Sequence, residues 1–158
     1  MKKKFHAWYQ PPALVTYAIR EENSLMTIFS SAKLNPKLIG KKNDIKLELM
    51  TLGGASNRIS SDARELLLLT SKVNIGDIVI LPLDDKGLKF KVAQVASDYK
   101  YTPSENIIHS RSLELSNRTW IKDDLPLSMY RALSDCLKGK FLKRVSFKLD
   151  EVHSYFEI

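Results

Sequence analysis

Hydrophobic and polar residues alternate with a period of two in the second half of the chain, which is the pattern of β-strands. The stretch IVILPL at 78–83 is almost continuously apolar, and DDKG joins it to LKFKVAQV at 88–95. In the second stretch, apolar positions alternate with Lys89 and Lys91. This arrangement predicts a β-hairpin.

A further alternating stretch, IIHSRSLEL at 107–115, predicts a strand that pairs with the hairpin. Near the start of the chain, KFHAWYQ predicts a first strand that ends at Pro11-Pro12. LMTIF at 25–29 predicts another, after a segment that fits a helix or a strand, and KRVSFKL at 143–149 predicts the last. Alternation in 107–115 places five residues on one face of that strand: Ile107, His109, Arg111, Leu113 and Leu115.

Three helices are expected between and after these strands. Asp44 is expected to cap a short helix through Met50, and Ser60 or Ser61 to cap DARELLLLTSKV, whose four consecutive leucines predict extensive burial. LPLSMYRALSDCLKG has proline near its start and glycine after its end, as helices often do. The elements together predict an α+β fold, a small curved β-barrel flanked by helices, in a single domain spanning residues 1–158.

The charge of the chain favours an anionic partner. Lysine and arginine number 25 against 18 acidic residues, which gives a net charge of +7. A surplus of this size favours nucleic acid or acidic lipid. The single cysteine, Cys136, excludes an internal disulfide and a cysteine-based zinc site. Because no apolar stretch is long enough to span a membrane, we expect a cytoplasmic protein without a membrane partner.

Residues suited to catalysis do not form a recognisable pattern. The three histidines are scattered, and the acidic pairs at 84–85 and 123–124 fit turns. Adjacent residues on an extended chain face opposite ways, so such pairs do not share a metal ion. The chain also has neither a phosphate-cradling glycine loop nor a nucleophile-elbow serine. We therefore expect no catalytic residue, metal or cofactor.

Aromatic and basic residues follow the predicted hairpin. A base withdrawn from its stack is held by flat side chains and read along its edge by polar groups, while cations neutralise the phosphates. The alternative is that the aromatic residues fill the core. The hypothesis assigns base stacking to Tyr99, Tyr101, Trp120 and Trp8, groove contacts to His109 and Arg111, and phosphate contacts to Lys89, Lys91, Lys100, Arg118 and Lys122.

Three motifs carry a resemblance to a known family. They are GDIVILPL at 76–83, Tyr99-Lys100-Tyr101, and HSRSL at 109–113. Over roughly residues 58–133, the chain resembles the amino-terminal domain of Mrr-type restriction endonucleases and related defence proteins. The resemblance implies a PUA/EVE-like fold, a small β-barrel flanked by helices that binds nucleic acid. Several members of that group hold a modified, flipped base in an aromatic pocket.

The resemblance implies a non-enzymatic module that recognises DNA, including a modified base, for a restriction or anti-phage system. DNA is favoured over RNA, and a nuclease effector domain or subunit is an expected partner. Three alternatives stay open: an RNA-binding PUA-like domain, a barrel-type RNase toxin, and an oligomerisation module built on the leucine-rich helices. Preference for RNA over DNA of equal sequence would distinguish the first of these, since a contacted 2′-hydroxyl tells the two apart.

Overall fold

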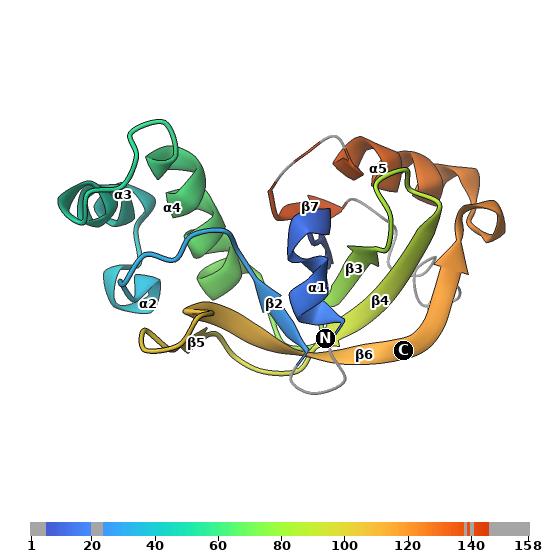
Figure 1. Ribbon diagram of the computed structural model, residues 1–158, viewed down its shortest axis with the longest axis horizontal. Helices are drawn as coiled ribbons and strands as arrows, with labels where there is room; N and C mark the ends of the chain where they lie inside the picture. The colour runs from blue at the N-terminus through green and yellow to red at the C-terminus, as the bar shows by residue number, and fades with distance from the viewer. Residues whose placement is uncertain (1–5, 20–23, 138, 140, 146–158) are drawn as a thin grey trace, which may run out of the picture.

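The computed structural model describes residues 6–19, 24–137, 139 and 141–145, and only the backbone of residues 117 and 118. The described chain is α+β, which confirms the predicted class. Its strands form one sheet in the order β2-β6-β4-β3-β1-β7, with β5 paired to β6 (Figure 1). The strands are β1 (Ala7–Tyr9), β2 (Leu25–Thr27), β3 (Ile78–Pro82), β4 (Lys89–Val95), β5 (Lys100–Tyr101), β6 (His109–Ile121) and β7 (Lys143–Val145).

The sheet does not close, so the predicted barrel is wrong. Among the described strands, β2 and β7 lie at opposite ends of the pairing order. Strand β1 runs parallel to β3, and the other pairs are antiparallel. The long strand β6 runs along the lower edge of the view in Figure 1, curves upward toward its end, and connects the two halves of the molecule. Helices cover both faces of the sheet, which lets it bury its apolar side chains without closing.

Helices lie at both ends of the bent sheet (Figure 1). Helices α3 and α4 pack on each other beside β2, and α5 lies at the other end. Their bounds are η1 (Pro12–Leu14), α1 (Val15–Ala18), α2 (Pro36–Ile39), α3 (Lys42–Thr51), α4 (Ile59–Leu67), the π-helical turn η2 (Leu68–Lys72), η3 (Lys122–Asp124) and α5 (Leu127–Leu137).

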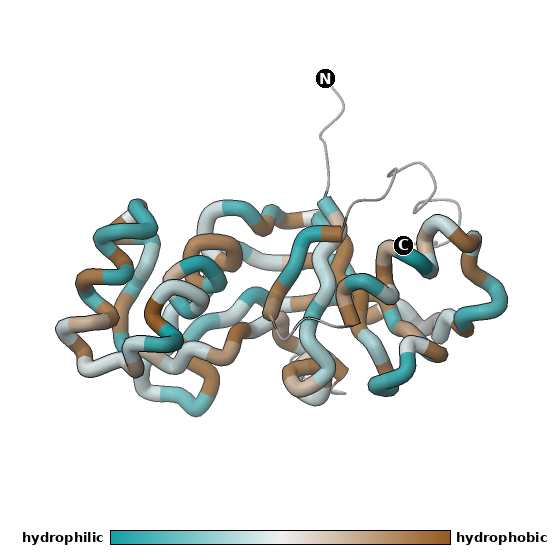
Figure 2. Tube along the Cα trace, turned by 90° about the horizontal axis from the view of Figure 1, so that it is seen from above, coloured by the Kyte–Doolittle hydropathy of each residue, from teal (hydrophilic) through white to brown (hydrophobic). Residues whose placement is uncertain are grey.

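Strand β3 divides its side chains between two hydrophobic cores. Val79 and Leu81 enter a larger core shared with α1, α3 and α4, whereas Ile78 and Ile80 enter a smaller one shared with α5. A strand buried on both faces needs apolar residues at every position, which explains its unbroken apolar sequence. Each fully buried leucine or isoleucine contributes about 1.5–3 kcal/mol. In Figure 2, hydrophobic segments run through the middle of the molecule.

The predicted hairpin is confirmed, because β3 and β4 pair antiparallel. The carboxylate of Asp84 accepts hydrogen bonds from three backbone N–H groups of the loop at 2.9–3.0 Å. Gly87 has a φ of 74°, and a Cβ atom there would overlap the side chain of Leu137. The loop therefore requires glycine both for its backbone and for its contact with α5.

Two predicted helix caps are wrong. Helix α3 begins at Lys42, so Asp44 lies within its first turn rather than before it. Helix α4 begins at Ile59, because the N–H of Asp62 already donates to the carbonyl of Arg58 at 2.8 Å. Ser60 and Ser61 consequently lie inside the helix. The ambiguous segment after the first strand is helical, and the last predicted strand is described only as far as β7.

The buried carboxylate of Asp77 joins β1 to β3. Its Oδ1 accepts from the backbone N–H of His6 at 2.9 Å. Its Oδ2 accepts from the indole Nε1 of Trp8 and from the backbone N–H of Asn74, both at 2.9 Å. Asp77 is fully buried, and so is its bond from Trp8, where water cannot replace the carboxylate; the bonds from His6 and Asn74 are partly buried.

We expect Asp77→Ala to lower the free energy of unfolding by about 1–3 kcal/mol, because the buried indole N–H of Trp8 would lose its acceptor. Urea denaturation followed by circular dichroism measures the change. Asp85→Ala is the control, since Asp85 is exposed and belongs to the neighbouring loop. Equal stability of the two variants would contradict this role.

Candidate functional site

The structure places the four aromatic residues of the stacking hypothesis in different environments. Trp8 is 1% exposed and donates its indole N–H to Asp77. Tyr99 is also buried, and its hydroxyl is hydrogen-bonded to Nδ1 of His109. Tyr101 and Trp120 are half-buried, and Trp120 packs against the smaller core. The stacking roles of Trp8 and Tyr99 are therefore wrong, because their ring faces are enclosed by the protein.

Arg111, expected in a groove, is also buried, with 3% of its surface exposed. Its guanidinium donates to the carbonyls of Leu69 at 2.7 Å, Thr70 at 3.1 Å and Ser97 at 3.3 Å. Leu69 and Thr70 belong to η2, the turn that ends α4, where carbonyl groups lack helical partners. Arg111 thus caps a helix end, and its predicted contact with a ligand is wrong.

His109 is fully buried, so its predicted groove contact is also wrong. Its Nε2 lies 2.7 Å from the carbonyl oxygen of Ala32, which can only accept, so Nε2 carries the hydrogen. Nδ1 then accepts from the hydroxyl of Tyr99. Burial lowers the pKa of His109, and the bond to Ala32 opposes this shift less strongly. The rings of Tyr99 and Tyr101 lie nearly parallel to the imidazole, with centroids 5.9 and 5.7 Å away.

These buried groups hold residues 29–33, the segment between β2 and α2. His109 binds the carbonyl of Ala32. The buried carboxyl group of Glu65 in α4 accepts from the backbone N–H of Phe29 and, at 3.2 Å, from that of Leu142. The hydroxyl of Ser30 lies 3.4 Å from the N–H of Ala32. His109, which was predicted to touch a ligand, therefore supports the 29–33 segment from its buried side, together with Glu65.

Two hollows adjoin the 29–33 segment. The first, which we call the Arg58 hollow, measures about 390 Å³ and lies between this segment, the α3–α4 connection, Arg58 and Asp62. The second, the Tyr17 hollow, measures about 260 Å³ and lies between Tyr17, residues 27–31 and residues 106–108. Phe29, Ser30 and Ser31 line both.

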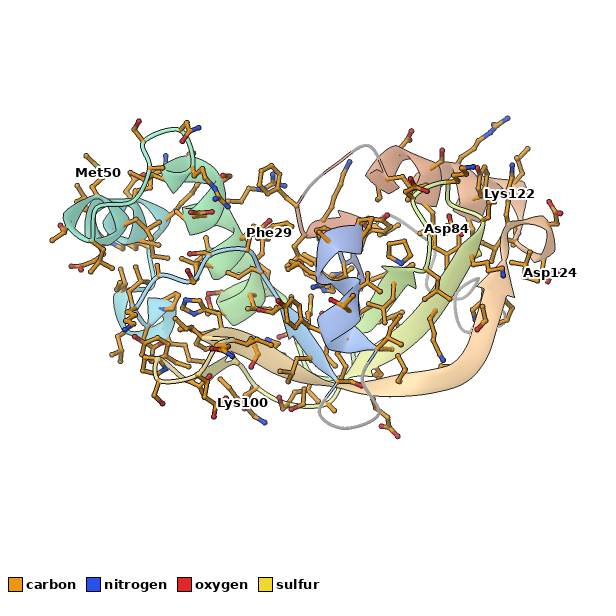
Figure 3. All side chains as sticks on the ribbon, viewed as in Figure 1. Phe29, Met50, Asp84, Lys100, Lys122 and Asp124 are labelled. Carbon is orange, nitrogen blue, oxygen red and sulfur yellow. The ribbon has the colours of Figure 1, made fainter. Side chains whose placement is uncertain are left out.

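The Arg58 hollow combines an aromatic ring with charges of both signs. Phe29 is 36% exposed, and Figure 3 shows it between α4 and α1. Lys33 and Arg58 are exposed, and Asp62 is half-buried. Burial raises the pKa of Asp62, while the charge of Arg58 opposes the shift. The arrangement suits a planar ligand that carries a negative group and a hydrogen-bond donor.

Five lysines lie in or next to helices α2 and α3, and we call them the lysine cluster; one of them, Lys33, lines this hollow. Asp44 is the only acidic residue between the first and the last of them. The α3 residue Leu49 also lines the Arg58 hollow, so the cluster and the hollow share a helix. None of these lysines is among the predicted phosphate contacts, although their spacing in the sequence is a usable signal. The cluster consists of Lys33, Lys37, Lys41, Lys42 and Lys46.

The cations predicted to contact phosphates do not form one surface. Lys100 lies at the lower left of the view in Figure 3, and Lys122 lies far from it at the upper right. Strand β6 extends between them, about 3.3 Å per residue, so roughly 35 Å of strand separates their attachment points. The amine of Lys100 donates to Ser112 Oγ at 3.0 Å, and that of Lys122 lies 4.6 Å above the ring of Tyr130.

The remaining predicted cations lie near the β4–β6 pair. Lys89 is exposed and Lys91 is half-buried on β4. Arg118 belongs to β6, and its side chain lies outside the described part of the chain. Strand β6 extends past the predicted stretch of 107–115 and continues to Ile121, where it pairs with Lys89.

Similarity to known proteins does not identify the function of this site. No protein-family model matches the chain, and neither a curated protein nor a solved structure resembles it significantly. Within the described residues, His, Cys, Asp and Glu side chains form no group of three or more that could hold a metal ion. None of the helices in the same residues is both long and apolar enough to cross a membrane.

The support of the 29–33 segment should depend on pH through Glu65. Burial raises the pKa of Glu65 to about 7, and the N–H groups of Leu142 and Phe29 oppose this shift. Since the folded state then binds the proton more tightly than the unfolded state, this contribution to stability is lost as pH rises from about 4.5 to about 7. We expect the wild-type chain to lose on the order of 3 kcal/mol of unfolding free energy over this pH range through Glu65, and Glu65→Gln to remove that loss.

Urea denaturation at pH 5, 6, 7 and 8 tests this, with Glu114→Gln as the control because Glu114 is exposed. Relative to wild type, the Glu65 variant should gain stability between pH 5 and pH 8, and the control should not. Parallel pH profiles for wild type and Glu65→Gln would show that Glu65 does not titrate in this range.

Proposed function

We propose that this chain is a nucleic-acid-binding module, with DNA favoured over RNA, and that the Arg58 hollow receives an unstacked base. The observation that carries the proposal is a hollow of about 390 Å³ that is lined by the exposed Phe29, by Arg58 and by Lys33 of the lysine cluster. Its volume lies at the lower end of the range of about 300–1,000 Å³ typical of small-ligand sites.

Each part of the site fits one part of a nucleotide. The ring of Phe29 offers a stacking surface, which is worth about 1–3 kcal/mol per base. The half-buried carboxylate of Asp62 can accept from an exocyclic amino group, as acidic side chains do with cytosine. Arg58 and the lysine cluster would neutralise the flanking phosphates. The net charge of +7 supports this assignment.

The preference for DNA and the biological role follow from the sequence resemblance. GDIVILPL and the motifs after it resemble the amino-terminal domain of Mrr-type restriction endonucleases, within a PUA/EVE-like group. We extend the proposal to recognition of a modified, flipped base in a restriction or anti-phage system in the cytoplasm. Cleavage would then belong to an effector domain or subunit, and the chain itself would not be an enzyme.

A second candidate function is self-association or binding of another protein. Leu38 of α2 is 85% exposed, and Leu47 and Met50 of α3 are each 60% exposed. Leu47 and Met50 are three residues apart in a helix and share a face. Hydrophobic segments continue to this end of the molecule in Figure 2. Light scattering after size-exclusion chromatography at two protein concentrations measures association, and Leu47→Lys should reduce it.

We expect binding to depend steeply on salt, and the lysine cluster to account for that dependence. Neutralising Lys37, Lys41 and Lys42 to glutamine should lower the slope of log affinity against log salt by about 2–3, at roughly one unit per phosphate contact. Fluorescence anisotropy with short labelled DNAs measures the slope. The matched control neutralises three other exposed lysines, Lys72, Lys86 and Lys143.

The oligonucleotides include unmodified DNA, DNA with methylated cytosine, hydroxymethylated cytosine or methylated adenine, and RNA of the same sequence. Tighter binding to one modified DNA would support base recognition, and preference for RNA would support the RNA-binding alternative. An equal loss of slope in the two triple variants would show that only overall charge matters. Absence of binding to every oligonucleotide at low salt would disprove the proposed function.

A further inference from the structure

The 29–33 segment separates two hollows rather than bordering one. Phe29, Ser30 and Ser31 line both the Arg58 hollow and the Tyr17 hollow. Phe29 precedes the two serines and exposes about a third of its surface. Both hollows, at about 390 and 260 Å³, are small, so each suits a single compact ligand group.

Buried hydrogen bonds hold this partition in place. Glu65 accepts from the N–H of Phe29, and His109 donates to the carbonyl of Ala32. Next to them, the hydroxyl of Thr27 donates to the carbonyl of His109 at 2.6 Å, which joins β2 to β6. A partition anchored to α4 and β6 keeps the hollows apart without prior ordering by a ligand, which reduces the cost of binding.

The two hollows offer different chemistry. The Arg58 hollow carries Lys33, Arg58 and Asp62. The Tyr17 hollow is lined by apolar side chains and by uncharged polar ones, which include Tyr17 and Asn106. The amide of asparagine can both donate and accept, which suits the edge of a base. The difference indicates two separate groups of one ligand, with the more anionic part near Arg58.

We propose that the chain binds two consecutive unpaired nucleotides, one base in each hollow, with the ring of Phe29 between them. This inference rests on the proposed function. Apolar side chains of other proteins separate neighbouring bases in this way, at the expense of base stacking. Because a paired and stacked duplex does not offer two separated bases, the ligand class is single-stranded or locally unpaired nucleic acid.

An NMR titration of the ¹⁵N-labelled chain tests the proposal at low salt, with a deoxymononucleotide, a 5′-phosphorylated deoxydinucleotide, a single-stranded tetranucleotide and a hairpin duplex. The mononucleotide should shift the amide signals around Lys33, Arg58 and Asp62. The dinucleotide should also shift those of residues 106–108 and bind about tenfold more tightly, the gain expected for a second stacked base.

Two pairs of variants separate the contributions. Ala13 is exposed and lines the Tyr17 hollow, so Ala13→Phe should abolish the gain from the second base and leave mononucleotide binding unchanged. Ala96→Phe, at an exposed position outside both hollows, is the matched control. Phe29→Leu keeps an apolar side chain without a flat ring. It should lower the affinity for the dinucleotide several-fold more than Ser31→Ala does.

The outcomes distinguish this inference from the function on which it rests. Equal affinity for mononucleotide and dinucleotide, with salt-dependent binding of longer strands intact, would overturn the two-hollow arrangement alone. So would binding of the hairpin duplex as tightly as the tetranucleotide. If no nucleotide or oligonucleotide shifts any amide signal, both the inference and the proposed function fail.

Discussion

Polar side chains buried on β6 must find hydrogen-bond partners inside the protein, and this requirement positions the surface segments around the sheet. Arg111 reaches the carbonyl groups that end α4, and His109 reaches the carbonyl of Ala32. A buried polar group left without a partner costs about 1–3 kcal/mol. Since these partners lie far away in sequence, one strand determines both where α4 ends and where the 29–33 segment runs, and thereby shapes the two hollows.

In this arrangement, buried residues position the backbone, and exposed residues are the ones that can contact a ligand. Tyr99 and His109 contribute no surface of their own, but they orient the backbone of the segment that carries Phe29. Contact with a ligand is left to exposed or half-exposed groups on other elements, such as Lys33 and Arg58. A site built in this way is preorganised, so less of the binding free energy is spent on ordering loops.

Local patterns in the sequence predict the central strands of the sheet, but they do not predict how those strands contact the surrounding helices and loops. Alternation placed His109, Arg111 and Leu113 on one face correctly, because that periodicity is a property of any strand. Burial of the two polar members depends on partners in α4 and the 29–33 segment, which alternation cannot show. The two hollows could not be predicted for a similar reason. Their lining residues come from separate parts of the chain and lie close together only in the folded protein; they include Tyr17, Phe29, Arg58 and Asn106.

The two cores on opposite faces of the sheet differ in how firmly they hold their helices. Helix α3 buries only Ile45 and Leu49, whereas α5 buries Met129, Leu133 and Cys136 in the smaller core. Helices with few buried contacts open with a lower free energy than the rest of a protein. We therefore expect the part of the Arg58 hollow formed by α3 to open with a lower free energy than β3, β4 and α5. A ligand bound in the Arg58 hollow would then slow amide exchange in α3 as well as at the residues that it contacts directly.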